Sequence, residues 1–331
     1  MKLTQLDKAS IIAIRDCMGT QPNETVLVIT DEFKKKIGYS LYRNALQLGH
    51  EALFVEMKSR EMHGEEPPQQ IAELMKMFDV VLCPTEKSLT HTSARRNASA
   101  LGVRVATFPG ITEEIMIRGL NADYKKIAAL TIKLKEILDK TNIVRVTAPG
   151  GTDITMDITG RDALPSKGLF HKKGESGNLP TGEAYIAPLE GKSNGVFVVD
   201  GSMAGIGVMK GKGIRIEVKN GLAVNVSGGV QASKLNSILD KYGEPARNIA
   251  EFGIGTNNKA KLSGNLLEDE KVMGTIHIAL GDNKSMGGNV AIPIHLDGVV
   301  KKPTLFLDGK MIMKNGRFHP GGQFIFLPPR R

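Results

Sequence analysis

The sequence predicts an α/β protein whose N-terminal domain is a doubly wound, mainly parallel sheet and whose C-terminal domain is a strand-rich α+β structure. Two observations predict this class. Over the first third of the chain, short aliphatic runs alternate with helix-compatible segments, as in doubly wound folds. After residue 141 the pattern changes to short alternating strands separated by glycine and asparagine turns. We therefore expect an α/β domain at residues 1–141 and an α+β domain at residues 142–331.

The elements of the first domain follow one another in strict alternation. A strand at residues 25–30 precedes a helix-compatible stretch that ends at Leu48. The further strands are expected at residues 51–56, 80–82 and 103–107, and the further helices at residues 71–78 and 93–101. A last helix is expected at residues 124–140, because its apolar side chains recur at helical spacing, with Asn121 or Asp123 available as its N-cap.

The short alternating strands of the second domain include one at residues 154–159, and a clear hairpin at residues 214–226 turns at an Asn-Gly pair. Two later strands, at residues 275–280 and 292–297, each carry one histidine among aliphatic residues. Side chains alternate across a strand, so each histidine lies on the face opposite its aliphatic neighbours.

Composition limits the classes of function. The chain has 331 residues, of which 24% are charged and 41% hydrophobic, and no apolar run approaches the length of a membrane span. We expect a cytoplasmic protein without membrane partners. Its net charge of +9 comes from dispersed lysines and arginines with 5% aromatic residues and no tryptophan, which favours a generally basic surface over nucleic-acid binding. Cys17 and Cys83 are far apart, so we expect neither a disulfide framework nor a thiolate zinc site.

Imidazole and carboxylate groups are therefore the candidate metal ligands. His295 and Asp297 leave one face of a strand at adjacent positions, and such a nitrogen and oxygen pair suits zinc, cobalt, manganese or iron. His277 alone is equally compatible with a structural histidine. Glu183 and Glu251 lie among small or apolar neighbours, where each is either a ligand or a hydrogen-bonded turn or surface residue.

Together these five residues predict a metal site in the second domain. They exceed the usual four ligands of one zinc ion, so a pair of divalent ions bridged by Glu183, Glu251 or Asp297 is expected, with His277 and His295 as terminal ligands. Such a pair activates a water molecule. One carboxylate, Glu183 or Glu251, could instead stay off the metal as a general base.

The segments that carry these residues resemble the thermophilic aminopeptidase (aminopeptidase T) family of metallopeptidases. The resemblance covers residues 179–183, 250–257, 277–281 and 295–297 in the order of that family, and residues 92–112 of the first domain. It implies two zinc, cobalt or manganese ions, the same five ligands, a homodimer, and hydrolysis of the N-terminal peptide bond of a peptide substrate.

One departure from that family leaves alternatives open. The short segment between His277 and His295 contains no tyrosine, which removes a candidate donor to the transition state. A shorter relative, the iron-dependent dihydroxypyridine dioxygenase, resembles this chain in size, and His277, His295 and Asp297 could then hold one iron(II) ion. A non-catalytic metal-binding scaffold is the third possibility. The aminopeptidase is the function that we expect.

Overall fold

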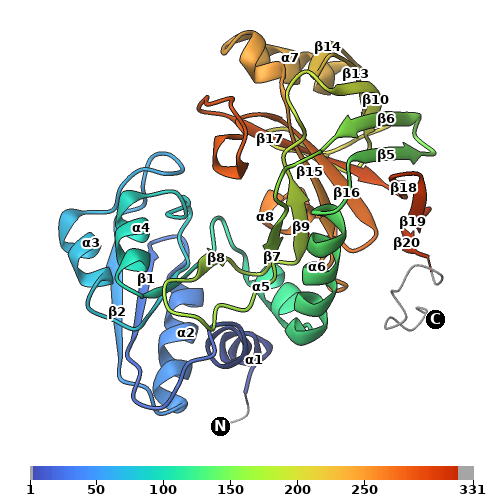
Figure 1. The fold of residues 1–331 in the computed structure, drawn as a ribbon. Coiled ribbons are helices and arrows are strands. Elements are labelled where there is room, and N and C mark those ends of the chain that lie inside the picture. The colour runs from blue at the N-terminus through green and yellow to red at the C-terminus, as the bar shows by residue number, and fades with distance from the viewer. Residues whose placement is uncertain (1–2, 320–331) are drawn as a thin grey trace. The chain divides into compact units, whose positions relative to one another are not determined.

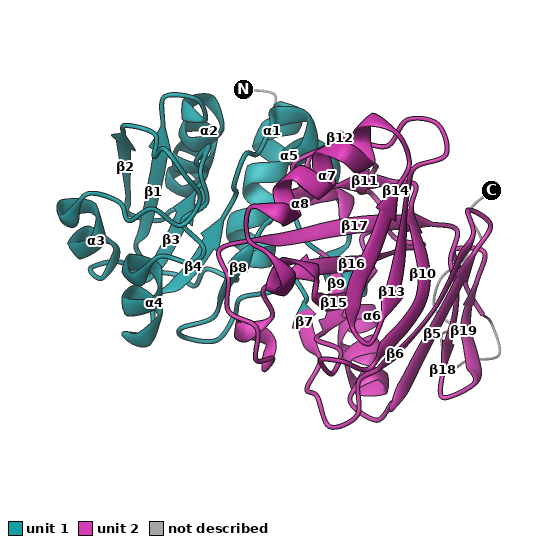
Figure 2. Cartoon of the chain, turned by 90° about the horizontal axis from the view of Figure 1, so that it is seen from above, with its two compact units in different colours: residues 1–128, 166–181 teal, residues 129–165, 182–331 magenta. Residues whose placement is uncertain are grey.

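The computed structural model describes residues 3–319 (Figure 1). The chain forms two compact units: unit 1 comprises residues 1–128 and 166–181, and unit 2 comprises residues 129–165 and 182–331 (Figure 2). The chain first passes from unit 1 to unit 2 inside helix α6 (Tyr124–Leu138). Residues 166–181 belong to unit 1 again and contribute strand β8 (Ser176–Asn178) to it. That strand contains no aliphatic residue, so the sequence pattern gives no signal for the return. The boundary after residue 141 stays a prediction.

Unit 1 is built on a parallel five-stranded sheet with the order β2-β1-β3-β4-β8, which confirms the expected class. Its other strands are β1 (Val26–Asp31), β2 (Ala52–Met57), β3 (Val80–Cys83) and β4 (Arg104–Thr107). Its helices are α1 (Gln5–Ile11), the π-helical turn η1 (Ile12–Cys17), α2 (Lys35–Gln47), α3 (Gln69–Met75), α4 (Ser93–Ala100) and α5 (Glu113–Leu120). Strands β1, β3 and β4 are buried along their whole length, as central parallel strands require.

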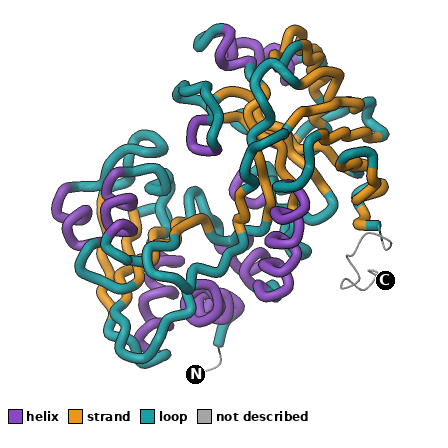
Figure 3. The backbone as a smooth tube through the Cα atoms, in the orientation of Figure 1, coloured by secondary structure: helices purple, strands orange, loops and turns teal. Residues whose placement is uncertain are grey.

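Unit 2 is rich in strands (Figure 3) and contains two largely antiparallel sheets. The eight-stranded sheet has the order β14-β13-β10-β6-β5-β18-β19-β20. Its strands are β5 (Ile143–Ala148), β6 (Thr152–Asp157), β10 (Ser193–Val199), β13 (Ile214–Lys219), β14 (Leu222–Ser227), β18 (Thr304–Leu307), β19 (Lys310–Lys314) and β20 (Arg317–Phe318). The expected hairpin is confirmed as β13 and β14, which pair antiparallel around Asn220 and Gly221.

The seven-stranded sheet has the order β12-β11-β17-β16-β15-β9-β7. Its strands are β7 (Leu164–Ser166), β9 (Glu183–Ile186), β11 (Ser202–Met203), β12 (Gly207–Val208), β15 (Ile249–Gly255), β16 (Thr275–Gly281) and β17 (His295–Lys301). The remaining helical elements of the unit are α7 (Val230–Asp240), η2 (Glu244–Arg247), α8 (Leu266–Asp269) and η3 (Lys284–Met286). Strand β17 starts three residues later than residue 292, because the segment before it is a loop that closes back on Asp282.

One apolar core lies between the two sheets of unit 2. It joins side chains of the eight-stranded sheet, such as Val146 and Phe197, to side chains of the seven-stranded sheet, such as Phe252 and Ile278. Alternation along each strand sends every second residue of β9, β15, β16 and β17 to the other face. That other face is the one that carries the polar side chains.

Candidate metal centre

One face of the seven-stranded sheet holds every side chain that the sequence nominates as a ligand. Directly paired residues point to the same face, and so do residues two positions apart along a strand. By this rule, the register of strands β9, β15, β16 and β17 places one set of side chains together opposite the core: Glu183, Glu251, His277, His295 and Asp297. The structure therefore brings all five residues together, and all five belong to unit 2.

Small residues occupy the positions between these long side chains. They are Gly253, Gly255, Ala279 and Gly281. The closest approach is at Gly253, where a Cβ atom would lie 2.0 Å from Nε2 of His277. Glycine inside a strand often marks a close approach of this kind. The imidazole of His277 thus lies directly over the backbone of β15.

A β-bulge in β15 turns Glu251 toward this face. Ile249 pairs with Leu280 and Glu251 pairs with Ala279, so β15 uses one more residue than β16 over this stretch. The extra residue changes the parity of the strand. Ile249 therefore contributes to the core, while Glu251 points to the polar face.

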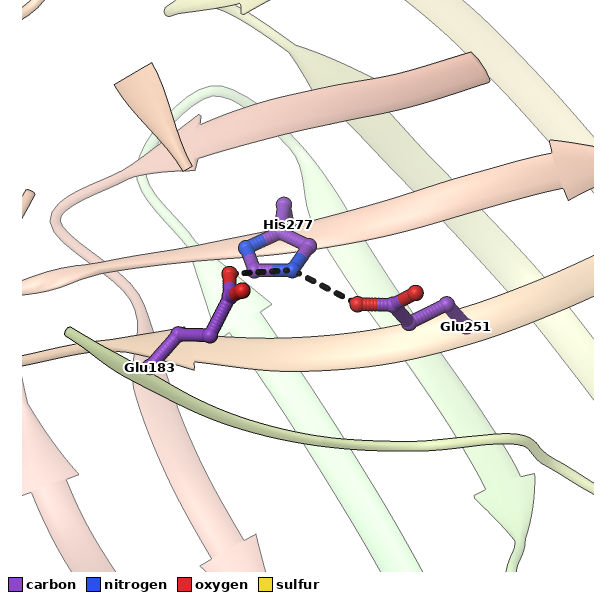
Figure 4. Close-up of side chains that lie close together, drawn as sticks. All are labelled: Glu183, Glu251 and His277. Carbon is purple, nitrogen blue, oxygen red and sulfur yellow. Dashed lines mark hydrogen bonds and ion pairs between the residues drawn. The ribbon is translucent and has the colours of Figure 1, made fainter. Parts of the chain in front are cut away.

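Glu251 lies between the two histidines. Its Oε1 is 3.0 Å from Nε2 of His277, and its Oε2 is 3.2 Å from Nε2 of His295. Asp297 Oδ1 lies 3.4 Å from Nε2 of His295, and Glu183 Oε2 lies 3.6 Å from Nε2 of His277. Figure 4 shows the imidazole of His277 flanked by the carboxylates of Glu183 and Glu251. The Nε2 atoms of both histidines thus face carboxylates.

Two charged residues extend the cluster. Lys271, just after α8, is buried, and its Nζ lies 2.7 Å from Oε1 of Glu183 and 2.5 Å from Oε2 of Glu270. The sequence analysis did not nominate either residue. They belong to a charged stretch, residues 268–271, whose composition is typical of a solvated turn, and only the fold reveals its burial.

Several polar atoms of the cluster are buried without a hydrogen bond among residues 3–319. They are Oε2 of Glu183, Oδ1 of Asp297 and Nδ1 of His277. A buried acceptor without a donor costs about 1–3 kcal/mol, so such atoms indicate a missing partner. His295 differs, because its Nδ1 lies 2.8 Å from the carbonyl oxygen of Asp282. A proton on Nδ1 donates to that carbonyl, which leaves the Nε2 lone pair free for a metal ion.

The charges of the cluster shift its proton affinities. Burial alone would lower the pKa of His277, but the hydrogen bond to Glu251 and the charge of Glu183 raise it to about 9. Burial would also lower the pKa of His295, but Asp297 and Glu251 raise it well above its usual value. Burial and the negative charges of Asp297 and Glu183 raise the pKa of Glu270 to about 8, against the opposing effect of Lys271. Protons therefore neutralise this cluster when no metal ion does.

The donor set fits a metal ion. Two groups of three ligand atoms, each within 4.8 Å of one another, occur among the described residues: Glu183 with Glu251 and His277, and Glu251 with His295 and Asp297. Both groups combine nitrogen and oxygen donors and share Glu251. The triad of His277, His295 and Asp297 is not one of these close groups and stays a prediction, as do the two-ion site and the catalytic roles of Glu183 and Glu251.

Comparison with known proteins identifies the family. The family model for NicX, 2,5-dihydroxypyridine 5,6-dioxygenase, matches residues 13–320. The chain belongs to this family. A curated member, the 2,5-dihydroxypyridine 5,6-dioxygenase of Pseudomonas putida strain KT2440, is 22% identical over 245 residues, which are 69% of this chain and 68% of the relative.

Solved structures show the same fold. The 2,5-dihydroxypyridine dioxygenase structure from Pseudomonas putida KT2440 superposes with a TM-score of 0.82 at 16% identity, covering 97% of this chain and 99% of the other. AmpT from Thermus thermophilus superposes with a TM-score of 0.69 at 18% identity, covering 95% of this chain and 98% of the other. The expected resemblance to the aminopeptidase T proteins therefore holds for the fold.

The expected activity is wrong. The sequence analysis favoured a metallo-aminopeptidase, a hydrolase, whereas the family match and the curated relative indicate a dioxygenase. The segments that resemble aminopeptidase T carry the side chains on the polar face of the seven-stranded sheet. The dioxygenase and AmpT structures share this fold, so the segments predicted the fold and not the reaction. The dioxygenase was the stated alternative, based on the size of the chain and on His277, His295 and Asp297, and the missing tyrosine spoke only against the peptidase. Tyr185 instead lies on the polar face, paired with Gly253.

No helix among residues 3–319 has the length and apolar character needed to cross a bilayer. The homodimer, the cytoplasmic location and the absence of a nucleic-acid partner stay predictions.

Proposed function

We propose that this protein opens the ring of a dihydroxylated pyridine with dioxygen, using one iron(II) ion. The family match over residues 13–320 is the observation that carries this proposal. The polar face of the seven-stranded sheet supports it, because it offers imidazole and carboxylate donors that suit iron(II). In the overall reaction the ring bond between two carbon atoms breaks, and both oxygen atoms of dioxygen enter the product.

We assign the ion to Glu251, His295 and Asp297. Access favours this group over the other one, because the side chain of His295 is 30% exposed while that of His277 is 1% exposed. A substrate therefore reaches the cluster on the His295 side. Bound there, the ion would supply the redox chemistry that couples dioxygen to ring opening.

The protein's own groups would orient the ion's ligands and the substrate. His277 donates from Nε2 to Oε1 of Glu251 and so fixes the direction of that carboxylate. The carbonyl of Asp282 fixes the tautomer of His295. Burial and the charges of Glu251 and Glu183 raise the pKa of the Tyr185 phenol, which therefore keeps its proton and can donate to a ring oxygen.

The direct test is oxygen uptake by protein loaded anaerobically with iron(II), using 2,5-dihydroxypyridine as the probe. We expect one dioxygen to be consumed for each ring lost, and no uptake with 2-hydroxypyridine, which lacks the second hydroxyl group. The exposed hairpin variant Glu217→Gln is the matched control and should retain full activity. Iron-loaded protein that consumes no oxygen with any dihydroxypyridine isomer would contradict the proposal.

A further inference from the structure

We propose that the ammonium group of Lys271 serves as a built-in cation that holds Glu183 and limits the cluster to one metal ion. This inference rests on the proposed function, because it concerns the same metal site. It assigns a positioning role to a residue that contacts neither of the histidines in the described hydrogen bonds and ion pairs.

The position of Lys271 is the first argument. Its Nζ lies between two carboxylates, 2.7 Å from Oε1 of Glu183 and 2.5 Å from Oε2 of Glu270. The Lys271 side chain is 5% exposed, so water provides little screening.

The second argument is the geometry of Glu183. One of its oxygens is held by Lys271, and the other is directed toward His277 without a hydrogen bond. A metal ion in the group of Glu183, Glu251 and His277 would therefore share a carboxylate with the ammonium. Two like charges on one buried carboxylate repel each other strongly. In the group around His295, the described ion pairs include no lysine or arginine, and the other partner of Glu251 is the imidazole of His277.

The third argument is the sum of the charges. The cluster contains four carboxylates that together carry up to four negative charges, three of them buried and one half-buried: Glu183, Glu251, Asp297 and Glu270. Lys271 and one divalent ion offset three of them. A second divalent ion would give five positive charges against four negative ones and would place three cations close together where water provides little screening.

Metal stoichiometry tests the role of Lys271. The full-length protein, its Lys271→Ala variant and its Lys271→Arg variant are saturated with cobalt(II), desalted and analysed for metal per chain, with circular dichroism as the measure of folding. We expect a ratio of about one for the wild type, about two for Lys271→Ala and about one again for Lys271→Arg, which keeps the charge. The exposed residue Lys234 provides the matched control, since Lys234→Ala should also bind about one ion.

Two results would overturn the inference. One is a wild-type protein that binds two ions, which decides the question even if Lys271→Ala does not fold. The other is a folded Lys271→Ala variant that still binds a single ion. Oxygen uptake is measured separately. A wild-type protein that binds one ion per chain but consumes no oxygen would reject the proposed reaction alone. A wild-type protein that binds two ions per chain and consumes oxygen normally would reject this inference alone.

Discussion

Two buried acidic sites, one in each unit, differ in how completely their oxygens are satisfied. In unit 1, Asp7 is 3% exposed, and its Oδ2 accepts from the backbone and hydroxyl of Thr4. Its Oδ1 accepts from Ser40, Arg43 and Asn44. In unit 2, Glu183 and Asp297 are similarly buried, but each has an oxygen that accepts no hydrogen bond from the residues that the structure describes.

The difference teaches that burial alone does not identify a metal ligand. Burial would raise the pKa of Asp7, yet its hydrogen bonds to Thr4, Asn44 and Arg43 lower it overall, so the carboxylate is stable as an ion. The unit 2 cluster reaches a similar balance only with protons on its histidines or with a metal ion. Counting donors around each carboxylate therefore separates a structural site from a binding site.

The strongest test of the comparison removes one carboxylate of the unit 2 cluster. Asp297→Ala should lower the affinity for cobalt(II), which replaces iron(II) as the probe, by more than about 100-fold, because it removes a proposed ligand and not an outer-shell partner. Oxygen uptake should disappear with it. Isothermal titration with cobalt(II) measures the affinity, and full occupancy in this variant would show that Asp297 is only a packed strand residue.

The corresponding substitution in unit 1 should lower the stability of the protein and leave its metal binding unchanged. Asp7→Ala should lower the free energy of unfolding by about 2–3 kcal/mol, because it removes the acceptor of several hydrogen bonds, including charged ones. Metal content should not change. Urea denaturation and metal analysis of the same preparation check both statements, and loss of metal from this variant would contradict the separation of the two sites.

A smaller effect is expected from the close approach under His277. Gly253→Ala places a methyl group where His277 Nε2 lies, so the imidazole must move away from Glu251. We expect metal affinity to fall by about 10-fold while the sheet remains folded. Gly150→Ala is a suitable control, because the nearest atom to its new Cβ is at 3.5 Å, an ordinary contact. Equal affinities in the two variants would exclude a positioning role for Gly253.

The smallest effect should appear in the pH dependence of the metal-free protein. The pKa of His277 is raised from 6.5 to about 9 in the folded state, so the folded state binds this proton more tightly than the unfolded state does. The resulting stabilisation is complete below pH 6.5 and is lost as the pH rises toward 9. The raised pKa of Glu270, about 8, acts in the same direction.

Thermal melts of metal-free and metal-loaded protein between pH 6.5 and 9 measure this effect. The metal-free protein should lose melting temperature across the range, while the loaded protein should change much less, because the metal replaces the protons. Asp7, with its lowered pKa, contributes only in acid, so Asp7→Ala should leave this alkaline trend unchanged. A melting temperature of the metal-free protein that rises toward pH 9 would contradict the charge balance described for the cluster.

The sequence predicted most of the fold because its elements are locally consistent. The strands and helices predicted for unit 1 appear as β1 to β4 and α2 to α4, with ends within a few residues of the predicted ones. Asp123 caps α6 as expected, because its Oδ1 accepts from the backbone N–H of Lys126. The strand parity of His277 was also predicted correctly, since Ile276 and Ile278 lie in the core. Strand β8 was missed because its pairing is imposed by tertiary contacts.

The site could be predicted only in part. The five nominated residues were found because histidine and carboxylate side chains interrupt aliphatic strands, and strand alternation indicates their faces. Lys271 was missed because a lysine next to acidic residues usually faces water, and its burial depends on how the turn after α8 folds. The reaction was not readable from these residues, because the same donors serve hydrolysis and oxygen chemistry.

The bulge in β15 has a consequence for how this protein can change length. Ile249 and Glu251 are two positions apart yet point to opposite faces, so pairing this stretch without the bulge would send an isoleucine toward the ligands or a carboxylate into the core. Deleting Ala250 would make the two residues adjacent and should leave each on its present face. Away from the bulge, single-residue insertions or deletions within β15, β16 or β17 change the face of the side chains that follow and should be far more damaging than point substitutions. Length variation among homologues is expected in the connecting loops instead.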